Sequence, residues 1–287
     1  MTRLMLALLL AGAACGWAQE GKLRILAIGA HPDDCDIRFG GTAAKMAQAG
    51  HAVKFISVTN GAGGHHEMGG GILANRRRGE ARESARRLGI AEYEVWDNPD
   101  GELMPTIEVR RELIRAIREW KADVVLGPRP NDYHPDHRYT GILMQDAAYM
   151  VVVPNLVSDT PALRKNPVFI YYMDGFEKPA PFRPDVAVAI DDVWDQKVNA
   201  LDAHVSQMYE WLPWADNRLA EIPADPAARK DWLSRTRAPR VTDAIRAALE
   251  KRYGADKAGQ VKYCEAFELC EYGRRPSPEE LDGIFPK

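Results

Sequence analysis

Cysteine is scarce in this sequence of 287 residues, and charge of neither sign predominates. Of the four cysteines, only Cys35, Cys264 and Cys270 follow the first 20 residues. An odd number cannot form a closed disulfide framework, so we expect these three to be free thiols that pack as small apolar side chains. The formal net charge of −3 gives no reason to expect nucleic acid as a partner.

Long apolar runs are also missing after the first 20 residues, and a membrane helix needs roughly 20 apolar residues in succession. The opening segment, MTRLMLALLLAGAACGWAQE, combines a basic residue, an apolar stretch and small residues at Gly16 and Ala18, as a secretory signal does. We therefore expect residues 1–18 to be a signal peptide. The mature protein is then exported to the periplasm or the extracellular space and has no transmembrane span. Lipoprotein anchoring at Cys15 is a less favoured alternative, because the usual aliphatic residue before it is missing.

Apolar runs typical of β-strands alternate with helix-like segments through most of the remaining chain. The strand-like runs are residues 23–29, 52–59, 93–96, 123–127, 167–172 and 185–190, and the helix-like segments are 40–50, 75–88, 107–120 and about 192–210. This alternation predicts an α/β fold with a Rossmann-like, mainly parallel sheet and helices on both faces. We expect one domain over residues 21–210. A C-terminal extension over 211–287, with a strand-like run at 261–269, is expected to pack on the core.

Two turns rich in histidine and aspartate follow strand-like runs of this predicted sheet. AHPDD at residues 30–34 follows the first run, and RPNDYHPDHR at 129–138 follows the fourth. Sites in parallel sheets form beyond the carboxyl ends of the strands, so we expect the two turns to converge. Taken singly, the first turn also fits a capped helix start and the second a polar loop. A phosphate-binding loop is disfavoured because the first turn is acidic and has no GxGxxG or GKS/T pattern.

Together the two turns offer the ligands of a catalytic zinc site. Such a site uses three protein ligands, usually nitrogen and oxygen donors, and leaves a fourth position for water. We expect His31, Asp34 and His137 to bind the metal.

The remaining polar residues of the turns are candidates for the chemistry. The side chains of Asp33 and Asp34 leave the backbone in different directions, so Asp33 is the candidate general base that takes a proton from the attacking water. We expect His134 to donate a hydrogen bond to a developing oxyanion, and Asp136 to orient that imidazole.

In five motifs, in the same order along the chain, the sequence resembles the LmbE/PIG-L-like zinc-dependent N-deacetylases. The motifs are AHPDD (30–34), R-x-x-E (77–80), PDGEL (99–103), NDYHPDHRYTG (131–141) and HVSQ (204–207). The resemblance covers approximately residues 23–210. It implies hydrolysis of an N-acyl group, typically N-acetyl, from an N-acetylglucosamine-type sugar or conjugate, with Zn²⁺ or another divalent metal such as Fe²⁺ as cofactor.

The same resemblance implies a role for each matching residue. It supports the three metal ligands, the general base and the oxyanion donor assigned above. It further implies that Arg77 and Asp100 hold the sugar or its aglycone, so the partner is a small-molecule or glycan substrate. It implies nothing about the oligomeric state.

Two features depart from the family pattern. Cys35 stands where the family usually has Glu, so a carboxylate that would support the metal ligands is lost. The glycine-rich stretch GAGGHHEMGGG (61–71) has no counterpart in the resemblance, and His65, His66 and Glu67 within it fit either a second metal site or, preferably, a flexible substrate lid.

Two other functions stay open beside hydrolysis of an N-acetylated sugar. One is an amidase that acts on a larger sugar or lipid conjugate. The other is a non-catalytic sugar-binding protein on the same scaffold, which Asp33 and His134 argue against because binding alone needs neither a base nor an oxyanion donor.

Overall fold

The structure is a computed structural model that describes residues 21–287. The predicted signal peptide and Cys15 lie outside the described residues. Among the helices of residues 21–287, none combines the length and the apolar character that a membrane crossing requires.

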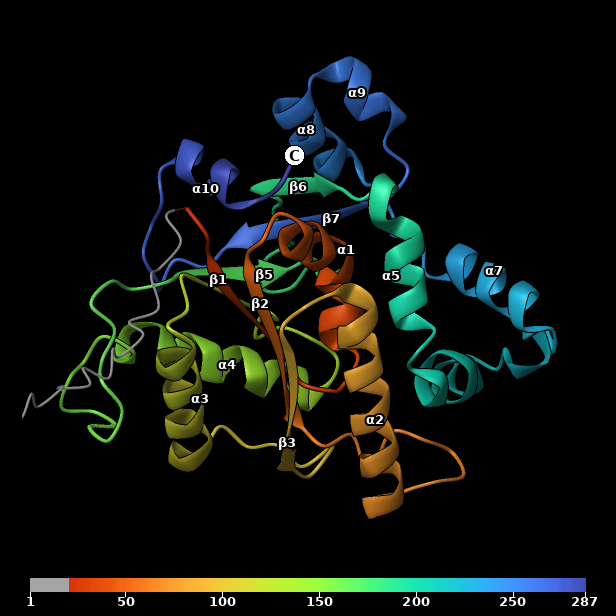
Figure 1. Ribbon diagram of the computed structural model, residues 1–287, viewed down its shortest axis with the longest axis horizontal. Coiled ribbons are helices and arrows are strands. Elements are labelled where there is room, and N and C mark those ends of the chain that lie inside the picture. Colours follow the sequence, from red (N-terminus) through yellow and green to blue (C-terminus); the bar gives the residue numbers. More distant parts are fainter. Residues whose placement is uncertain (1–20) are drawn as a thin grey trace, which may run out of the picture.

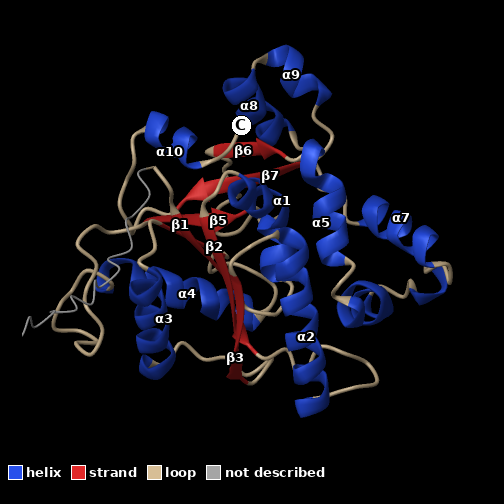
Figure 2. Cartoon of the chain, viewed as in Figure 1, coloured by secondary structure: helices blue, strands red, loops and turns tan. Residues whose placement is uncertain are grey.

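A seven-stranded sheet with the order β3-β2-β1-β4-β5-β7-β6 forms the centre of the molecule (Figure 2). The first five strands are parallel: β1 (Arg24–Gly29), β2 (Ala52–Thr59), β3 (Glu92–Asn98), β4 (Val124–Gly127) and β5 (Val168–Tyr172). The segments RILAIG and VVLG are apolar on both sides because helices cover both faces of a parallel sheet. The predicted α/β fold with a mainly parallel sheet is confirmed.

Helices cover the two faces of the sheet (Figure 1). On one face α1 (Asp34–Gln48), α2 (Gly70–Leu88) and α5 (Trp194–Leu201) pack together, and on the other α3 (Ile107–Trp120) packs beside α4 (Pro135–Met150). The helix α3 illustrates why these helices pack on the sheet. Its apolar residues recur at helical spacing, so they form one buried face: Val109, Leu113, Ile114 and Ile117. Each face has its own hydrophobic core.

Residues after 210 complete the same sheet. The strand β7 (Cys264–Leu269) lies between β5 and β6 (Val186–Ala189) and is antiparallel to both. Its neighbours along the chain are α6 (Leu212–Ala215), α7 (Pro226–Thr236), α8 (Asp243–Tyr253), α9 (Ala255–Gln260) and α10 (Pro278–Ile284). The three cysteines of the described chain are free and buried, as predicted.

Two predictions about helices are wrong. The single helix expected over 192–210 is interrupted, because α5 ends at Leu201. The N–H and Oγ of Ser206, at the start of the next helical turn, both bond to the carboxylate of Glu80, at 2.9 and 2.6 Å. A π-helical turn over Ser206–Trp211 follows. The sequence analysis also predicted no helix after the second polar turn, although α4 begins at Pro135 within it. Pro135 lies in the first turn of this helix, where proline is well tolerated.

The strand order reverses between β1 and β4. From β1 the chain continues to β2 and β3 on one side, and it returns to β4 and β5 on the other. Such a point leaves a crevice beyond the carboxyl ends of the two central strands. Both polar turns of the sequence begin there, directly after β1 and β4.

Candidate metal centre

The first turn is held in shape by the side chain of Asp34. Its Oδ2 accepts hydrogen bonds from the backbone N–H groups of Ala30 and His31, at 2.9 and 2.8 Å. The imidazole of His31 then meets His137 from the turn that follows β4.

Three donor atoms from the two turns come together as the sequence predicted. His31 Nδ1 lies 3.1 Å from His137 Nε2, and Asp34 Oδ2 lies 3.6 and 3.4 Å from these two nitrogens. Ligands at about 2.0–2.2 Å from a tetrahedral zinc are roughly 3.4 Å apart, so the three atoms match one face of such a tetrahedron. The His, His, Asp donor set and its spacing therefore fit a divalent metal.

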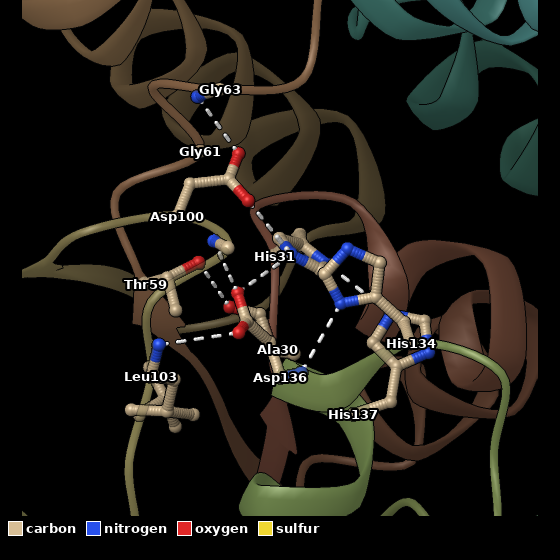
Figure 3. Close-up of polar contacts among 12 residues, drawn as sticks. Ala30, His31, Thr59, Gly61, Gly63, Asp100, Leu103, His134, Asp136 and His137 are labelled. Carbon is tan, nitrogen blue, oxygen red and sulfur yellow. Dashed lines mark hydrogen bonds and ion pairs between the residues drawn. The ribbon is translucent and has the colours of Figure 1, made fainter.

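Carboxylates stand behind both imidazoles. The remote nitrogen of His31, Nε2, lies 3.1 Å from Asp100 and 3.3 Å from Asp136, between the two carboxylates and well aligned with neither (Figure 3). The remote nitrogen of His137, Nδ1, lies 3.0 Å from Asp132. Metal-binding histidines usually turn their second nitrogen toward a carboxylate, which fixes the ring and makes it a better ligand.

The charged groups of this cluster shift one another's pKa values. Burial by itself lowers the pKa of His31, but its contacts with Asp100, Asp136 and Asp34 outweigh burial and raise that pKa well above its usual value. Burial raises the pKa of Asp34, but the charge of His137 and the hydrogen bond from His31 lower it far more. The site thus stabilises positive charge at the point where the three donors meet.

His134 differs from the other two histidines. One of its ring nitrogens lies within 4.8 Å of a ring nitrogen of His31 and of His137, so distance alone also admits it as a ligand. However, its Nδ1 caps α4 by accepting the N–H of Asp136 at 3.2 Å, and burial and the neighbouring histidines lower its pKa. A neutral imidazole that accepts at Nδ1 carries its proton on Nε2. His134 therefore presents a donor to the crevice, where a metal ligand would need a lone pair.

Asp33 and Arg77 form a buried pair below this cluster. Arg77 Nη2 donates to Asp33 Oδ1 at 2.9 Å, and its Nη1 donates to the carbonyl of Gly61 at 3.1 Å. Within the described chain the second oxygen of Asp33, Oδ2, accepts no hydrogen bond. One oxygen is thus fixed by the guanidinium and the other is free to accept a proton.

Gly61 is required by the same arrangement. Its φ is +70°, and a Cβ there would lie 2.6 Å from the guanidinium of Arg77. Both the left-handed backbone and the close approach demand glycine.

The side chains of Arg77 and Asp100 contact other protein groups. Arg77 is only 2% exposed, and Asp100 accepts from the N–H of Gly63 at 3.0 Å while facing His31. Contact with a sugar, which the resemblance implies for both, stays a prediction. The contacts present in the structure position Asp33 and His31.

The partner expected for Asp136 needs correction. Its carboxylate accepts the N–H groups of Gly101 and Leu103, at 2.7 and 3.2 Å, and faces His31. The imidazole of His134 is oriented instead by the backbone N–H of Asp136. The reason is that Asp136 lies in the first turn of α4, a helix that the sequence analysis missed.

Sequence reasoning also missed Asp132 and Glu80 as supporting groups. Asp132 Oδ1 accepts the N–H of His134 at 3.0 Å besides facing His137, so it shapes the turn and orients a ligand. Its place in the motif NDYHPDH was the available signal. Glu80 is 126 residues away from Ser206 in the chain, so only the fold shows that the two side chains are hydrogen-bonded.

The glycine-rich loop is tied to the segment after residue 203. His65 Nε2 contacts Glu210 at 2.8 Å, and its Nδ1 accepts the N–H of Glu67 at 3.0 Å, so both ring nitrogens are engaged. The ring of His66 is stacked between those of His65 and Trp214, at 4.6 and 5.1 Å. This bonding leaves His65 without a free ligand atom for a second metal and anchors the loop in place.

Cys35 and His204 are buried and contact partners outside the group of three donors. Cys35 is fully buried, and its Sγ lies 3.6 Å from the hydroxyl of Tyr172. His204 is also fully buried and lies 3.2 Å from Asp36. Burial raises the pKa of Cys35, which keeps the thiol protonated and inert.

Comparison with known proteins agrees with this geometry. The family model described as PIG-L, GlcNAc-PI de-N-acetylase, matches residues 26–148. Diacetylchitobiose deacetylase of Thermococcus kodakarensis is 34% identical over 203 residues, which cover 67% of this chain and 73% of that protein. The structure of N,N'-diacetylchitobiose deacetylase from Pyrococcus horikoshii superposes with a TM-score of 0.66 at 28% identity, covering 86% of this chain and 84% of the other. A 4-oxalmesaconate hydratase of Pseudomonas putida is 26% identical over 194 residues, 65% of this chain and 74% of that protein.

Proposed function

The chain belongs to the PIG-L family of de-N-acetylases, and from this premise we propose that it is a metal-dependent enzyme that hydrolyses the N-acetyl amide of an N-acetylglucosamine-type sugar. It is an amide hydrolase that acts on a carbon–nitrogen bond. The observation that carries the proposal is the meeting of His31, Asp34 and His137 beside a base and a neutral imidazole donor.

We propose zinc as the metal, held by His31, Asp34 and His137. Nitrogen and oxygen donors at tetrahedral spacing support this choice. When bound, the metal acts as a Lewis acid that lowers the pKa of water and polarises the substrate carbonyl.

Asp33 is the proposed general base. Arg77 holds one of its oxygens, so the free Oδ2 is kept in a fixed direction to take the proton of the attacking water. The same carboxyl group then returns the proton to the leaving amine. Arg77 acts here as a positioning residue through its contacts with Asp33 and Gly61.

His134 is the proposed oxyanion donor. The cap that it forms on α4 holds its Nε2–H toward the crevice before the reaction begins. A donor that is fixed in advance stabilises the negative charge that develops on the carbonyl oxygen without reorganisation.

Acetate release from N,N'-diacetylchitobiose tests these roles. Asp33→Asn is expected to lower kcat by about 10²–10⁴ while metal content stays at the wild-type level. Asp256→Asn is the matched control, because Asp256 is exposed on α9, and it should leave the rate unchanged. Near-normal acetate release by Asp33→Asn would contradict the mechanism.

The hydratase relative defines a second reaction to be checked. A base beside a metal centre also serves the addition of water to an unsaturated acid, and that relative shares 26% identity with this chain. Acetate release from a neutral acetylated sugar separates the two reactions, since a hydratase releases none. Assays with longer chitin oligosaccharides and acylated lipid-linked sugars separate a small-sugar deacetylase from an amidase for larger conjugates.

We further propose that the protein is exported after cleavage near Ala18. The support is the basic, apolar and small-residue pattern of the first 18 residues. N-terminal sequencing of protein recovered from the periplasm or medium tests it, and an intact residue 1–18 segment on cytosolic protein would contradict it.

A further inference from the structure

A cavity of about 690 Å³ adjoins the metal centre. It lies between α1, the loop after β5 and the segment that links α7 to α8. Arg38, Met173 and Asp174 line this cavity and also the small pocket that contains Asp34 and His137. The two spaces are therefore neighbours across the same three side chains.

An aromatic wall joins the catalytic histidines to this cavity. The ring of Tyr133, 72% exposed, lies 5.7 Å from the rings of both His134 and His137. On its other side it lies 6.4 Å from Phe176, which lines the cavity. A substrate whose amide is at the metal centre can thus extend along Tyr133 into the cavity.

Some of the charges around the cavity are already neutralised. Lys197 Nζ contacts Glu265 at 2.6 Å, and both side chains are almost fully buried. Arg129 holds Asp174 through two hydrogen bonds, at 2.6 and 2.5 Å. Neither pair leaves a net charge for a ligand.

The remaining charges are mostly positive. Arg38, Arg237 and Arg240 line the cavity, against a single unpaired acid, Glu177. Arg38 donates to the carbonyl of Met173 at 3.1 Å, and within residues 21–287 no carboxylate lies at ion-pair distance from it.

Arg237 is the most unusual of these cations. Its Nε is buried without a hydrogen-bond partner, and within the described chain no carboxylate pairs with its guanidinium. Burial lowers its pKa, the charges of Asp33 and Asp216 raise it, and those of Arg218 and Arg38 lower it. A half-buried cation without a carboxylate partner is costly, whereas Arg129, which lines the neighbouring small pocket, is held by both oxygens of Asp174.

We propose that Arg38 and Arg237 bind an anionic substituent, a carboxylate or a phosphate, on the aglycone side of the acetylated sugar. The inference rests on the proposed deacetylase function and narrows its substrate class. Two guanidinium groups offer planar, charge-assisted donors that match the oxygens of either anion. Arg237 comes from the C-terminal extension, so the extension supplies part of the substrate site.

The test compares substrates that differ only in charge. For the holoenzyme, kcat/KM of acetate release is measured with the methyl glycoside of N-acetylglucosamine, its carboxymethyl glycoside and N-acetylglucosamine 1-phosphate. We expect at least one anionic substrate to exceed the neutral one by about tenfold or more, the factor typical of a charge-assisted hydrogen bond. Comparison of kcat/KM for the two anionic substrates shows whether the site prefers a carboxylate or a phosphate.

Variants assign the preference to the two arginines. Arg237→Ala and Arg38→Ala should each lower the ratio of anionic to neutral kcat/KM about tenfold, and Arg237→Lys should lower it less. Arg235→Ala is the matched control, since it removes one positive charge from an exposed side chain of α7 that pairs with Asp231. Its ratio should stay at the wild-type value, and an equal fall there would overturn the assignment to Arg237.

Two further outcomes are separable. Acetate release without any preference for an anion overturns the inference and leaves the deacetylase function intact. If no sugar releases acetate, the proposed function is wrong, and the anion site is then tested by calorimetric binding of N-acetylglucosamine 1-phosphate to wild type and Arg237→Ala. Binding that is about tenfold weaker in the variant supports the anion site, and equal binding overturns it.

Discussion

His31 and His137 are 106 residues apart in the chain, yet His31 Nδ1 and His137 Nε2 lie only 3.1 Å apart. Two nitrogens of buried imidazoles approach this closely only when a proton or a cation lies between them, because their lone pairs otherwise repel. Both rings have a carboxylate at their remote nitrogen, so both are prepared to bind a cation.

Metal binding should distinguish the three histidines of the crevice. We expect His137→Ala to lose bound zinc, because one of three ligands is removed, and His134→Ala to keep it, because its Nε2 carries a proton. Metal analysis of the purified variants after dialysis checks this. Loss of metal from His134→Ala with retention in His137→Ala would reverse the two assignments.

Asp132 should tune the affinity for the metal without binding it. Asp132→Asn removes the charge that faces His137 Nδ1, and we expect zinc affinity to fall by about 10–100-fold, as for other supporting carboxylates. Competition with a chelator measures the change. Asp146→Asn on the exposed side of α4 is the control, and it should bind zinc as the wild type does.

Gly61→Ala should destabilise the protein and disturb Asp33 at the same time. The new methyl group meets the guanidinium of Arg77 on a left-handed backbone, so we expect a loss of about 1–3 kcal/mol in the free energy of unfolding, with a lower kcat. Gly79→Ala, on the exposed side of the same helix as Arg77, has open space and should instead stabilise by about 0.5–1 kcal/mol. Urea titrations of both variants check the opposite signs.

The contact between the glycine-rich loop and residue 210 should weaken in acid. Burial raises the pKa of Glu210, but hydrogen bonds from Arg76 and His65 lower it by a larger amount, so the folded-state pKa lies below the usual 4.5. The stabilising contribution is therefore complete above pH 4.5 and is lost as the pH falls through the lower folded-state value. Glu210→Gln should remove this part of the pH dependence, and thermal unfolding between pH 3 and 6 measures it. An unchanged slope in the variant would show that the contact contributes no stability.

Much of the metal centre could be predicted from the sequence. His31 and Asp34 lie in the turn that follows β1, and His137 lies ten residues after the end of β4. Parallel strands bring their carboxyl ends to one edge of the sheet, so the sequence pattern alone predicted that these three residues would converge there. The alternation of strands and helices likewise determined the α/β class, because apolar periodicity is a local property.

What the tertiary structure decided depends on contacts between residues far apart in the chain. Only the fold shows that Arg77 reaches Asp33 from another helix, that Asp136 faces His31, and that β7 enters the sheet between β5 and β6. The hydrogen bond from the Ser206 N–H to Glu80, 126 residues away in the chain, is likewise visible only in the fold. Local propensity has no information about such partners, because their distance along the chain hides the hydrogen bonds and charges that determine where each side chain points.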